Sequence, residues 1–392
     1  MGSDLSVCVA IGVRNGERFL DEAISSVLAQ THRRLELRIY DNRSHDGSAA
    51  IARGHLSDPR VSYTLNDGDL GYYGSLNRCL GETECEAFVP FAADDVMHPR
   101  NLERKLAAME ASGAALVFGP AHTIDEAAAT RGMLGWALTE RVFQAPSFFG
   151  ETAPVNCVPC PATLIRRGAL VELGGFDTRV PYSADWMAWL RLALRHTVAH
   201  VAEPLVSWRS HAGNGTSHGA RTAAFARDVP ATLHHAMLDP AFPAGWAPLR
   251  APFTAACLAN CARALDRSRH RRLADGMAAY ELSTRAALLQ PEVTEYRSQL
   301  ETLLPRAGLA RPCWPLEAVS LAGDASLALA GRLREAGLLA GCWESAGDLR
   351  PGRVALCGHG SQAVAMAEGI GVPALLHDPA DPLSDSGLAA FG

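Results

Sequence analysis

The sequence has very little lysine and no long hydrophobic run. Lys105 is the only lysine among 392 residues, so arginine supplies nearly all of the positive charge, which we attribute to codon bias before chemistry. The net charge of -6 and the isoelectric point near 6.2 argue against a nucleic-acid-binding protein, which is usually basic. No segment approaches about 18 uninterrupted apolar residues, so no membrane-spanning helix is expected.

A signal peptide and a disulfide framework are also missing. The N-terminal stretch MGSDLSVCVAIGV has no basic region and a short apolar run, which indicates a first strand. The ten cysteines are scattered, as expected of reduced thiols, and the close pair Cys157 and Cys160 lacks further ligands at zinc-site spacing. We therefore expect a cytoplasmic protein, and a place at the inner face of the membrane stays open.

The composition is that of a folded protein, and the first half alternates between two periodicities. With 48% hydrophobic and 20% charged residues, 392 residues are enough for two or three domains. Strands are expected at 5–13, 35–41, 61–66, 88–92 and 115–125, and helices at 18–30, 46–56, 74–82 and from Pro99. This alternation predicts a mostly parallel, three-layer α/β sheet of the Rossmann-like kind.

The remainder predicts two further parts. Residues 219–310 contain Ala- and Leu-rich helical stretches and form an expected helical region. Residues 311–392 show a strand and helix pattern typical of a small Rossmann-like α/β module. This module offers GDAS and GHGS but no G-x-G-x-x-G, so a structural or partner-binding role is expected ahead of dinucleotide binding.

Acidic residues follow two of the predicted strands. Asp41 ends the strand 35–41, and Asp94 and Asp95 follow the strand in FVPFAADD. A single aspartate at a strand end is a common turn residue. Because the carboxyl ends of parallel strands meet at one edge of a sheet, the three together are more informative. Two adjacent carboxylates there are explained either by exposure to solvent or by a divalent cation, which prefers oxygen ligands.

The stretch VCVAIGVRNGERFLDEAISSVLAQTHRRLELRIYDNRSHDGS resembles the N-terminus of family 2 glycosyltransferases of the GT-A fold. Those proteins have a strand with a short Asn-containing loop, a helix with S-V-x-x-Q-T, and a strand that runs into D-D-x-S-x-D-G-T. The last motif here is DNRSHDGS, and the motifs keep the family's order over about residues 5–215. The resemblance implies a GT-A domain over residues 1–218.

The resemblance also implies a donor site. Asp95 first, and Asp94 second, would contact a Mn²⁺ or Mg²⁺ ion that bridges the diphosphate of a nucleotide-sugar, although Ala92 stands where many relatives have another acid. The nucleobase and the adjoining groups would be contacted by Asp41, by the backbone around Ile11, Val13 and Arg14, by the loop residue Asn15, and by Asn77. For Asn77, a plain amide on a helix surface is an equal alternative.

An acceptor side is implied by the segment 172–196, which is similar to the family's G-G-F-D … E-D-W-x-L-W-L-R. The resemblance makes Asp185 the general base, with an N-cap as the alternative role, and Ala184 replaces the usual glutamate. The face formed by Trp186, Trp189, Leu190 and Ala193 is expected to be core.

A last motif lies at SWRSHAGNGTS, which is similar to the family's Y-R-x-H-x-x-S. By this resemblance His211 would approach the metal or the diphosphate, and Arg209 would be a countercharge for phosphate. A structural histidine is the alternative.

The resulting prediction is a metal-dependent inverting glycosyltransferase of bacterial glycan or glycoconjugate biosynthesis. Its donor would be a UDP-, GDP- or dTDP-sugar, and its acceptor a hydroxyl of a glycan, a lipid-linked glycan or a protein. A non-catalytic nucleotide-sugar-binding or scaffold protein is an alternative, because Ala92 and Ala184 replace acids. A nucleotidyltransferase is a second alternative, although IGVRNGERF has little of the expected Gly-rich basic loop. Peripheral membrane association and a homo-oligomer stay open.

Overall fold

The structure is a computed structural model, which describes residues 3–135, 139–211, 213–214 and 225–266, residue 286 and three short strands farther along the chain. Contacts divide the chain into two compact units, Met1–Gly219 with His235–Gly245, and Ala220–His234 with Trp246–Gly392. The domain borders expected after residues 218 and 310 stay a prediction. Within the described residues, no helix is long and apolar enough to cross a membrane.

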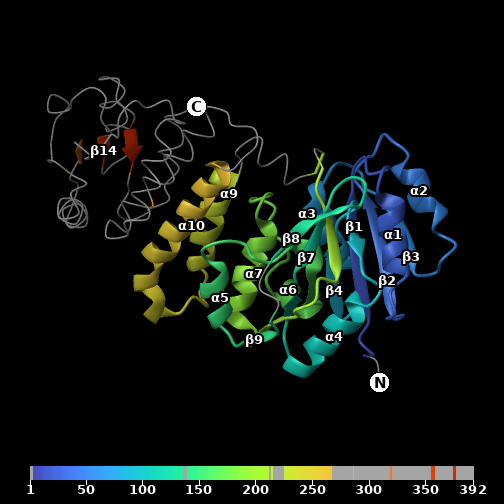
Figure 1. Ribbon diagram of the computed structural model, residues 1–392, viewed down its shortest axis with the longest axis horizontal. Helices are drawn as coiled ribbons and strands as arrows, with labels where there is room; N and C mark the ends of the chain where they lie inside the picture. Colours follow the sequence, from blue (N-terminus) through green and yellow to red (C-terminus); the bar gives the residue numbers. More distant parts are fainter. Residues whose placement is uncertain are drawn as a thin grey trace. The chain divides into compact units, whose positions relative to one another are not determined.

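The first unit alternates strands and helices along most of its length (Figure 1). Its strands are β1 (Val7–Val13), β2 (Leu35–Asp41), β3 (Val61–Leu65), β4 (Ala87–Phe91), β5 (Val96–Met97), β6 (Leu116–Phe118), β7 (Ala121–Ile124), β8 (Thr130–Leu134), β9 (Arg141–Phe143), β10 (Thr163–Arg166), β11 (Val198–His200) and β12 (Val206–Arg209). Its helices are α1 (Leu20–Leu28), α2 (Ser48–Gly54), α3 (Gly71–Glu82), α4 (Asn101–Ser112), α5 (Ser147–Thr152), the 3-10 turn η1 (Cys160–Ala162), α6 (Arg167–Glu172) and α7 (Ala184–Arg195).

Two sheets organise these elements. The larger has the order β3-β2-β1-β4-β10-β6-β11-β9, and the smaller has the order β5-β12-β7-β8. Strands β3, β2, β1 and β4 are parallel to one another, whereas β10 runs antiparallel to both β4 and β6. The expected α/β class with a sheet rich in parallel strands is therefore confirmed.

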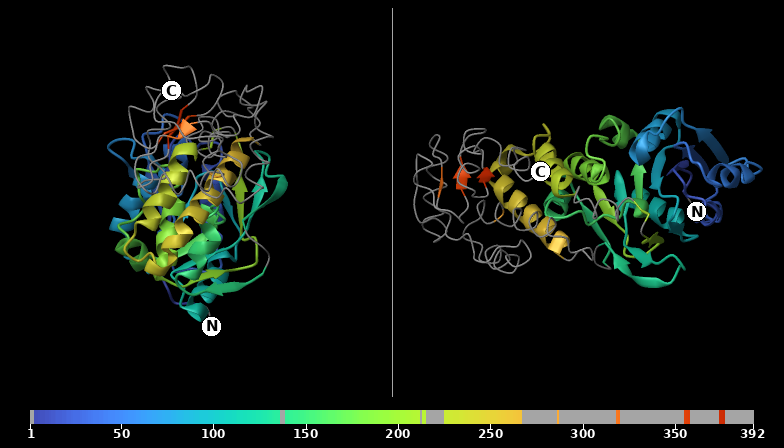
Figure 2. Two further views of the ribbon diagram at one scale, coloured as in Figure 1. Left: turned by 90° about the vertical axis from the view of Figure 1, so that its left-hand side faces the viewer. Right: turned by 90° about the horizontal axis from the view of Figure 1, so that it is seen from above.

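Helices cover both faces of the larger sheet. Alternate residues of a strand point to opposite faces, so the same strand packs against helices on both sides. The odd-numbered residues of β1 pack in one core with apolar residues of α1 and α4. On the other face, the Cys8 sulfur lies 3.5 Å from the sulfur of Cys79 on α3. This gives three layers, which can be followed from two further directions in Figure 2.

The strand expected over 115–125 is instead two strands in different sheets, β6 and β7. Gly119 and Pro120 separate them. A side chain at Gly119 would begin 2.9 Å from the carbonyl oxygen of Val201, and Pro120 has no backbone N–H for a ladder. The chain therefore leaves the larger sheet at this point and enters the smaller one.

The later part of the chain is described over shorter stretches. Helices α9 (Phe225–Met237) and α10 (Arg250–Asp266), with the 3-10 segment η2 (Ala244–Leu249), agree with the helical region expected there. Strands β13 (Ala318–Val319), β14 (Ala355–Cys357) and β15 (Ala374–Leu376) form a parallel sheet at three strands expected for the small module. The strand expected at 338–345 and the helices expected there lie outside the described residues.

Candidate functional site

Two of the acidic positions come together at one edge of the larger sheet. Asp41 is the last residue of β2, and Asp94 and Asp95 follow β4. Strand β1 lies between β2 and β4 and pairs in parallel with both, so that Val13 lies opposite Asp41. The end of β1 is therefore flanked on its two sides by carboxylates.

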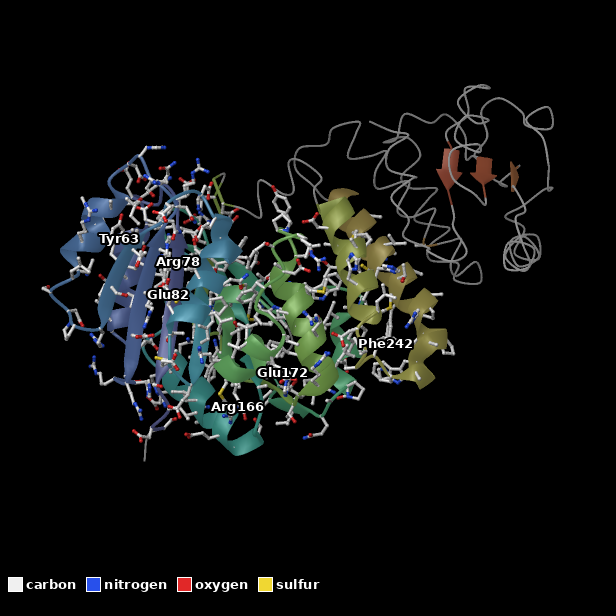
Figure 3. The ribbon with its side chains drawn as sticks, turned by 180° about the vertical axis from the view of Figure 1, so that it is seen from behind. Tyr63, Arg78, Glu82, Arg166, Glu172 and Phe242 are labelled. Atoms are coloured by element: carbon white, nitrogen blue, oxygen red, sulfur yellow. The ribbon has the colours of Figure 1, made fainter. Side chains whose placement is uncertain are left out.

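Asp41 is completely buried, and both of its oxygens accept hydrogen bonds. The backbone N–H of Ser44 donates to Oδ1 at 2.7 Å, and the hydroxyl of Tyr63 donates to Oδ2 at 2.9 Å. Tyr63 lies on β3 (Figure 3), and burial together with Asp41 raises the pKa of Tyr63 to about 12. The phenol thus stays a donor, and Asp41 is held as an oriented acceptor.

The loop after β1 is tied to the loop after β2. Asn15 has a left-handed φ of 52°, its N–H donates to the Ser44 hydroxyl at 2.9 Å, and its side-chain oxygen accepts from the His45 N–H at 2.9 Å. The Glu17 carboxylate accepts from the Gly47 N–H at 2.7 Å. These bonds fix the DNRSHDGS motif against the end of β1.

The other residues of β1 and its loop that were predicted to contact the nucleotide differ in burial. Ile11 and Val13 are buried strand residues, and the Val13 carbonyl accepts from the Asn42 N–H at 2.8 Å. Arg14 is exposed and pairs with Asp69. The predicted contacts of these residues with a nucleotide stay predictions.

The adjacent acids Asp94 and Asp95 differ in exposure. Asp95 is 1% exposed, and its Oδ1 accepts from the Arg209 N–H at 2.8 Å. Its Oδ2 has no hydrogen-bond partner among the described residues. Burial, with a smaller contribution from the charge of Asp94, raises the pKa of Asp95 well above its usual range. Asp94 keeps 22% of its side chain exposed.

His211 contacts the more exposed acid. Its Nε2 lies 2.8 Å from Oδ2 of Asp94, and its Nδ1 accepts from the Gly213 N–H at 3.2 Å. A neutral His211 ring therefore carries its proton on Nε2 and donates it to Asp94. In this arrangement His211 orients Asp94, and its predicted contact with the metal stays a prediction.

The carboxylate pair fits a divalent cation. The unsatisfied Oδ2 of buried Asp95 lacks a compensating donor, and a neighbouring carboxylate makes its charge more costly. No cluster of three His, Cys, Asp or Glu side chains suited to a metal occurs among the described residues. Such a site suits Mg²⁺ or Mn²⁺ held by one or two carboxylates, with the other ligands from water and phosphate.

Arg209 is buried, and its guanidinium donates hydrogen bonds to groups within the protein. It is 1% exposed, and Nη2 donates to Glu22 of α1 at 2.7 Å. Its Nε donates to the Asp94 carbonyl at 2.8 Å, and Nη1 to the Asp125 carbonyl at 3.0 Å. The guanidinium also lies 4.5 Å from the centre of the Phe19 ring. These contacts favour a structural role over the expected contact with phosphate, which stays untested.

Asn77 also makes contacts that favour a structural role. Its amide nitrogen donates to the Phe176 carbonyl, and its amide oxygen accepts from the Phe176 N–H, both at 2.8 Å. A side chain at Gly175 would begin 2.5 Å from the same amide oxygen. Asn77 therefore fixes the turn before α7 to α3, and its expected contact with ribose or diphosphate stays a prediction.

Asp185 lies in the first turn of α7 and is half-buried. Its Oδ1 accepts from the Trp186 N–H at 2.7 Å, and Asn156 Nδ2 lies 3.5 Å from its Oδ2. The N-cap position belongs to Ser183. Burial raises the pKa of Asp185 to about 6. The carboxylate is mostly ionised at neutral pH and is suited to accept a proton.

The helix face around Asp185 is core, as expected. Trp186, Trp189, Leu190 and Ala193 are each at most 1% exposed. The Trp186 indole N–H donates to the Thr152 carbonyl at 3.0 Å. These side chains fix α7 and with it the position of Asp185.

Tyr72 of α3 and Cys160 of η1 connect the two acidic regions. Burial, and then the charges of Asp185 and Asp95, raise the pKa of the Cys160 thiol well above its usual range. Burial, and then Cys160, Asp95, Asp94 and Asp185, act in the same direction on the pKa of Tyr72. Both groups therefore lie within the electrostatic reach of Asp95 and Asp185.

Several of these functional neighbours were not expected from the sequence. Tyr63 and Glu22 contact the expected residues across large sequence separations. Tyr72 and Cys160 are affected by the charges of Asp95 and Asp185. The GYYG and CVPC stretches have no spacing that indicates such a role. Only the pairing of distant elements brings them to the site.

Comparisons with known proteins show which family the chain is similar to. Residues 8–174 match the family described as Glycosyl transferase family 2. An uncharacterized glycosyltransferase of Haemophilus influenzae is 28% identical over 227 residues, which are 54% of this chain and 67% of that protein. An uncharacterized glycosyltransferase of Nostoc sp. is 27% identical over 225 residues, 54% of this chain and 66% of that protein. A Bacillus subtilis relative is 35% identical over 113 residues, 28% of this chain and 40% of its own length. The chain thus spans between 40% and 67% of these relatives' lengths.

Solved structures show the same fold. Staphylococcus aureus TarS 1–349 in complex with UDP has a TM-score of 0.55 at 12% identity, over 78% of this chain and 93% of that chain. The complex of TarS 1–349 with UDP-GlcNAc has a TM-score of 0.52 at 12% identity, with the same coverage of both chains. The likeness supports the expected GT-A class of fold.

Proposed function

Because this chain belongs to the family 2 glycosyltransferases, we propose that it is a metal-dependent, inverting enzyme of bacterial glycan or glycoconjugate biosynthesis. It would move a sugar from a nucleotide-sugar donor to an acceptor hydroxyl. The supporting observation is the placement of the acids: Asp41 and Asp95 flank the end of β1, and Asp185 lies in the first turn of α7.

The donor is proposed to be a nucleoside-diphosphate sugar, the class of the UDP-GlcNAc that one TarS structure holds, while another holds UDP. Asp41 is an acceptor whose two oxygens are already oriented by Ser44 and Tyr63. A nucleobase with a ring N–H would complement it. The tied loops after β1 and β2 would keep this acceptor in place without the donor.

Asp94 and Asp95 are the residues proposed to hold Mn²⁺ or Mg²⁺. When bound, the ion supplies positive charge that stabilises the leaving nucleoside diphosphate. His211 and the Arg209 backbone hold the two carboxylates. Asp94 is the more exposed of the two and is the better placed to meet an ion that arrives with the donor.

Asp185 is the proposed general base. It would take the proton of the acceptor hydroxyl while the acceptor oxygen forms a bond to the anomeric carbon. The bond from that carbon to the diphosphate oxygen breaks in the same displacement, so the configuration inverts. One carboxylate suffices, since the diphosphate is already a good leaving group, whereas a hydrolase uses two.

The main alternative is a protein that binds nucleotide-sugars without catalysis. It rests on Ala92 and Ala184, which stand where similar proteins have acids. Ala184 is fully buried, and its side chain does not reach solvent next to Asp185. The pKa of Asp185, raised to about 6, is that of a competent base, which favours the enzyme.

The experiment that tests the proposal is the substitution Asp185→Asn. We expect sugar transfer to fall by about 10²–10⁴-fold, the usual contribution of a general base, while affinity for the nucleoside diphosphate changes little. Transfer is followed as release of nucleoside diphosphate and affinity by calorimetry. Glu172→Gln, an exposed acid of α6, is the control. Unchanged turnover in Asp185→Asn would reject this base, and nucleotide binding without transfer in the unaltered chain would favour the alternative.

A further inference from the structure

Asp185 is contacted by a donor from the loop after α5. The side-chain oxygen of Asn156 accepts from the Val158 N–H at 3.1 Å, which determines which end of the amide is the oxygen. Its nitrogen therefore points to Asp185, at 3.5 Å from Oδ2. The contact is long, but its direction is set by a second bond. Ala184, the residue before the base, carries no polar group and is buried.

A second polar side chain that acts on Asp185, Tyr73, comes from α3. The Tyr73 ring lies 5.0 Å from the Tyr72 ring and 5.3 Å from the Phe176 ring, centre to centre. Phe176 is held at its backbone by Asn77, and its ring meets Trp189 of α7 at 6.2 Å. This chain of ring contacts connects Tyr73 of α3 through Phe176 to Trp189 of α7. The Tyr73 side chain lowers the pKa of Asp185, against the larger effect of burial.

We propose that Tyr73 and Asn156 are positioning residues that hold the Asp185 carboxylate from two separate elements. This inference rests on the proposed function, in which Asp185 is the base. Asn156 donates to the carboxylate from the loop after α5, and Tyr73 acts on it from α3, so each stabilises its ionised form. Together they leave the base oriented toward the acceptor and ionised at neutral pH.

Few other groups around Asp185 change charge near neutral pH. The titratable or charged side chains of the two helices packed against α7 are Glu151 of α5, and Arg167 and Glu172 of α6. The charge of Asp185 also acts on Tyr72, Tyr73 and Cys160. Burial raises the pKa of the two tyrosines and of Cys160, so all three stay neutral. Glu151 lies 3.8 Å from Arg141, and Glu172 lies 3.7 Å from His196.

The expected signature is a change in the pH dependence of transfer. Tyr73→Phe keeps the ring and removes the hydroxyl, and Asn156→Ala removes the amide. Either loss makes the ionised form of Asp185 less stable. The acidic limb of the pH profile of kcat/KM should therefore move to higher pH by about half to one pH unit. Activity at high pH, where the base is ionised in all variants, should stay within about threefold of the unaltered chain. Asn156→Asp replaces a donor by a negative charge and should move the limb further than Asn156→Ala.

The decisive measurement is kcat/KM from about pH 5 to pH 9 for these variants, with Val155→Ala as the control from the same exposed loop. Thermal denaturation shows whether each variant is folded, and the Asn156 variants test the inference if Tyr73→Phe is not. A shift of the acidic limb to higher pH in these variants, larger in Asn156→Asp than in Asn156→Ala, supports the inference. An unmoved limb, with activity unchanged or lowered equally at every pH, would overturn it. Failure of the proposed base is a separate result, namely full turnover in Asp185→Asn.

Discussion

At the scale of single residues, Asp95 shows how an unfavourable local arrangement can indicate function. Its Oδ2 is buried without a donor among the described residues, and the adjacent Asp94 raises the pKa of Asp95 further. A buried carboxylate of this kind lowers the free energy of unfolding unless a cation or a proton neutralises its charge. A divalent ion brought with the donor would do so, and this gives the first prediction.

Asp95→Ala should weaken binding of a nucleoside diphosphate by about tenfold or more in Mn²⁺, because one of two carboxylates that would hold the ion is lost. In EDTA the variant and the unaltered chain should bind almost equally. Calorimetry with and without Mn²⁺ measures both affinities. An equal loss under the two conditions would contradict a metal role for Asp95.

At the scale of elements, α4 has an unusual buried face. Leu102, Leu106 and Met109 belong to the core, but Asn101 and Lys105 are buried on the same helix. Neither the ammonium of Lys105 nor the amide of Asn101 has a hydrogen-bond partner among the described residues. Burial lowers the pKa of Lys105 to about 7. The only lysine of the chain therefore lowers the stability of the fold at neutral pH.

Lys105→Met should raise the free energy of unfolding by on the order of 3–5 kcal/mol at pH 6, since a thioether of similar length replaces a buried charge. A lysine has a pKa near 10.4 in the unfolded chain, so the unfolded state binds more protons between about pH 7 and pH 10. Stability of the unaltered chain thus rises with pH over that range and levels off below pH 7. The advantage of Lys105→Met should shrink accordingly toward pH 10.

Chemical denaturation at pH 6, 8 and 10 measures this change. Arg104→Met, the neighbouring position on the same helix with a half-exposed guanidinium, is the control and should show no comparable pH dependence. An equal difference at all three pH values would show that Lys105 does not titrate in this range.

At the scale of the whole molecule, the proposed donor should stabilise the folded chain. A ligand present at 100 times its dissociation constant adds about 2.7 kcal/mol to the free energy of unfolding, which shifts a melting temperature by several degrees. We expect one among UDP-, GDP- and dTDP-sugars to give such a shift with Mn²⁺ and a smaller one with EDTA. A thermal-shift screen of these donors measures it, with Asp41→Asn as a variant that should lose the preference. No shift with any donor would count against the nucleotide-sugar site.

The fold and part of the site followed from local patterns. Hydrophobic periodicity predicted β1 to β4 and α1 to α3 close to their observed bounds, because the period of a strand or a helix is set by backbone geometry. The same approach missed the break between β6 and β7, because a short apolar run containing Gly119 and Pro120 has no period that reveals a change of sheet. Motif resemblance named Asp41, Asp95 and Asp185 but not the side chains that hold them.

The sequence by itself indicated the resemblance to family 2 glycosyltransferases, the α/β class and the acids at the strand ends, since these depend on short stretches of neighbouring residues. Only the tertiary structure decided what the polar side chains contact. Arg209 is paired with Glu22, 187 positions away, and Asn77 with Phe176, 99 positions away. Whether an arginine or an asparagine is available to a ligand depends on which distant groups satisfy its hydrogen bonds, and no local pattern records that pairing.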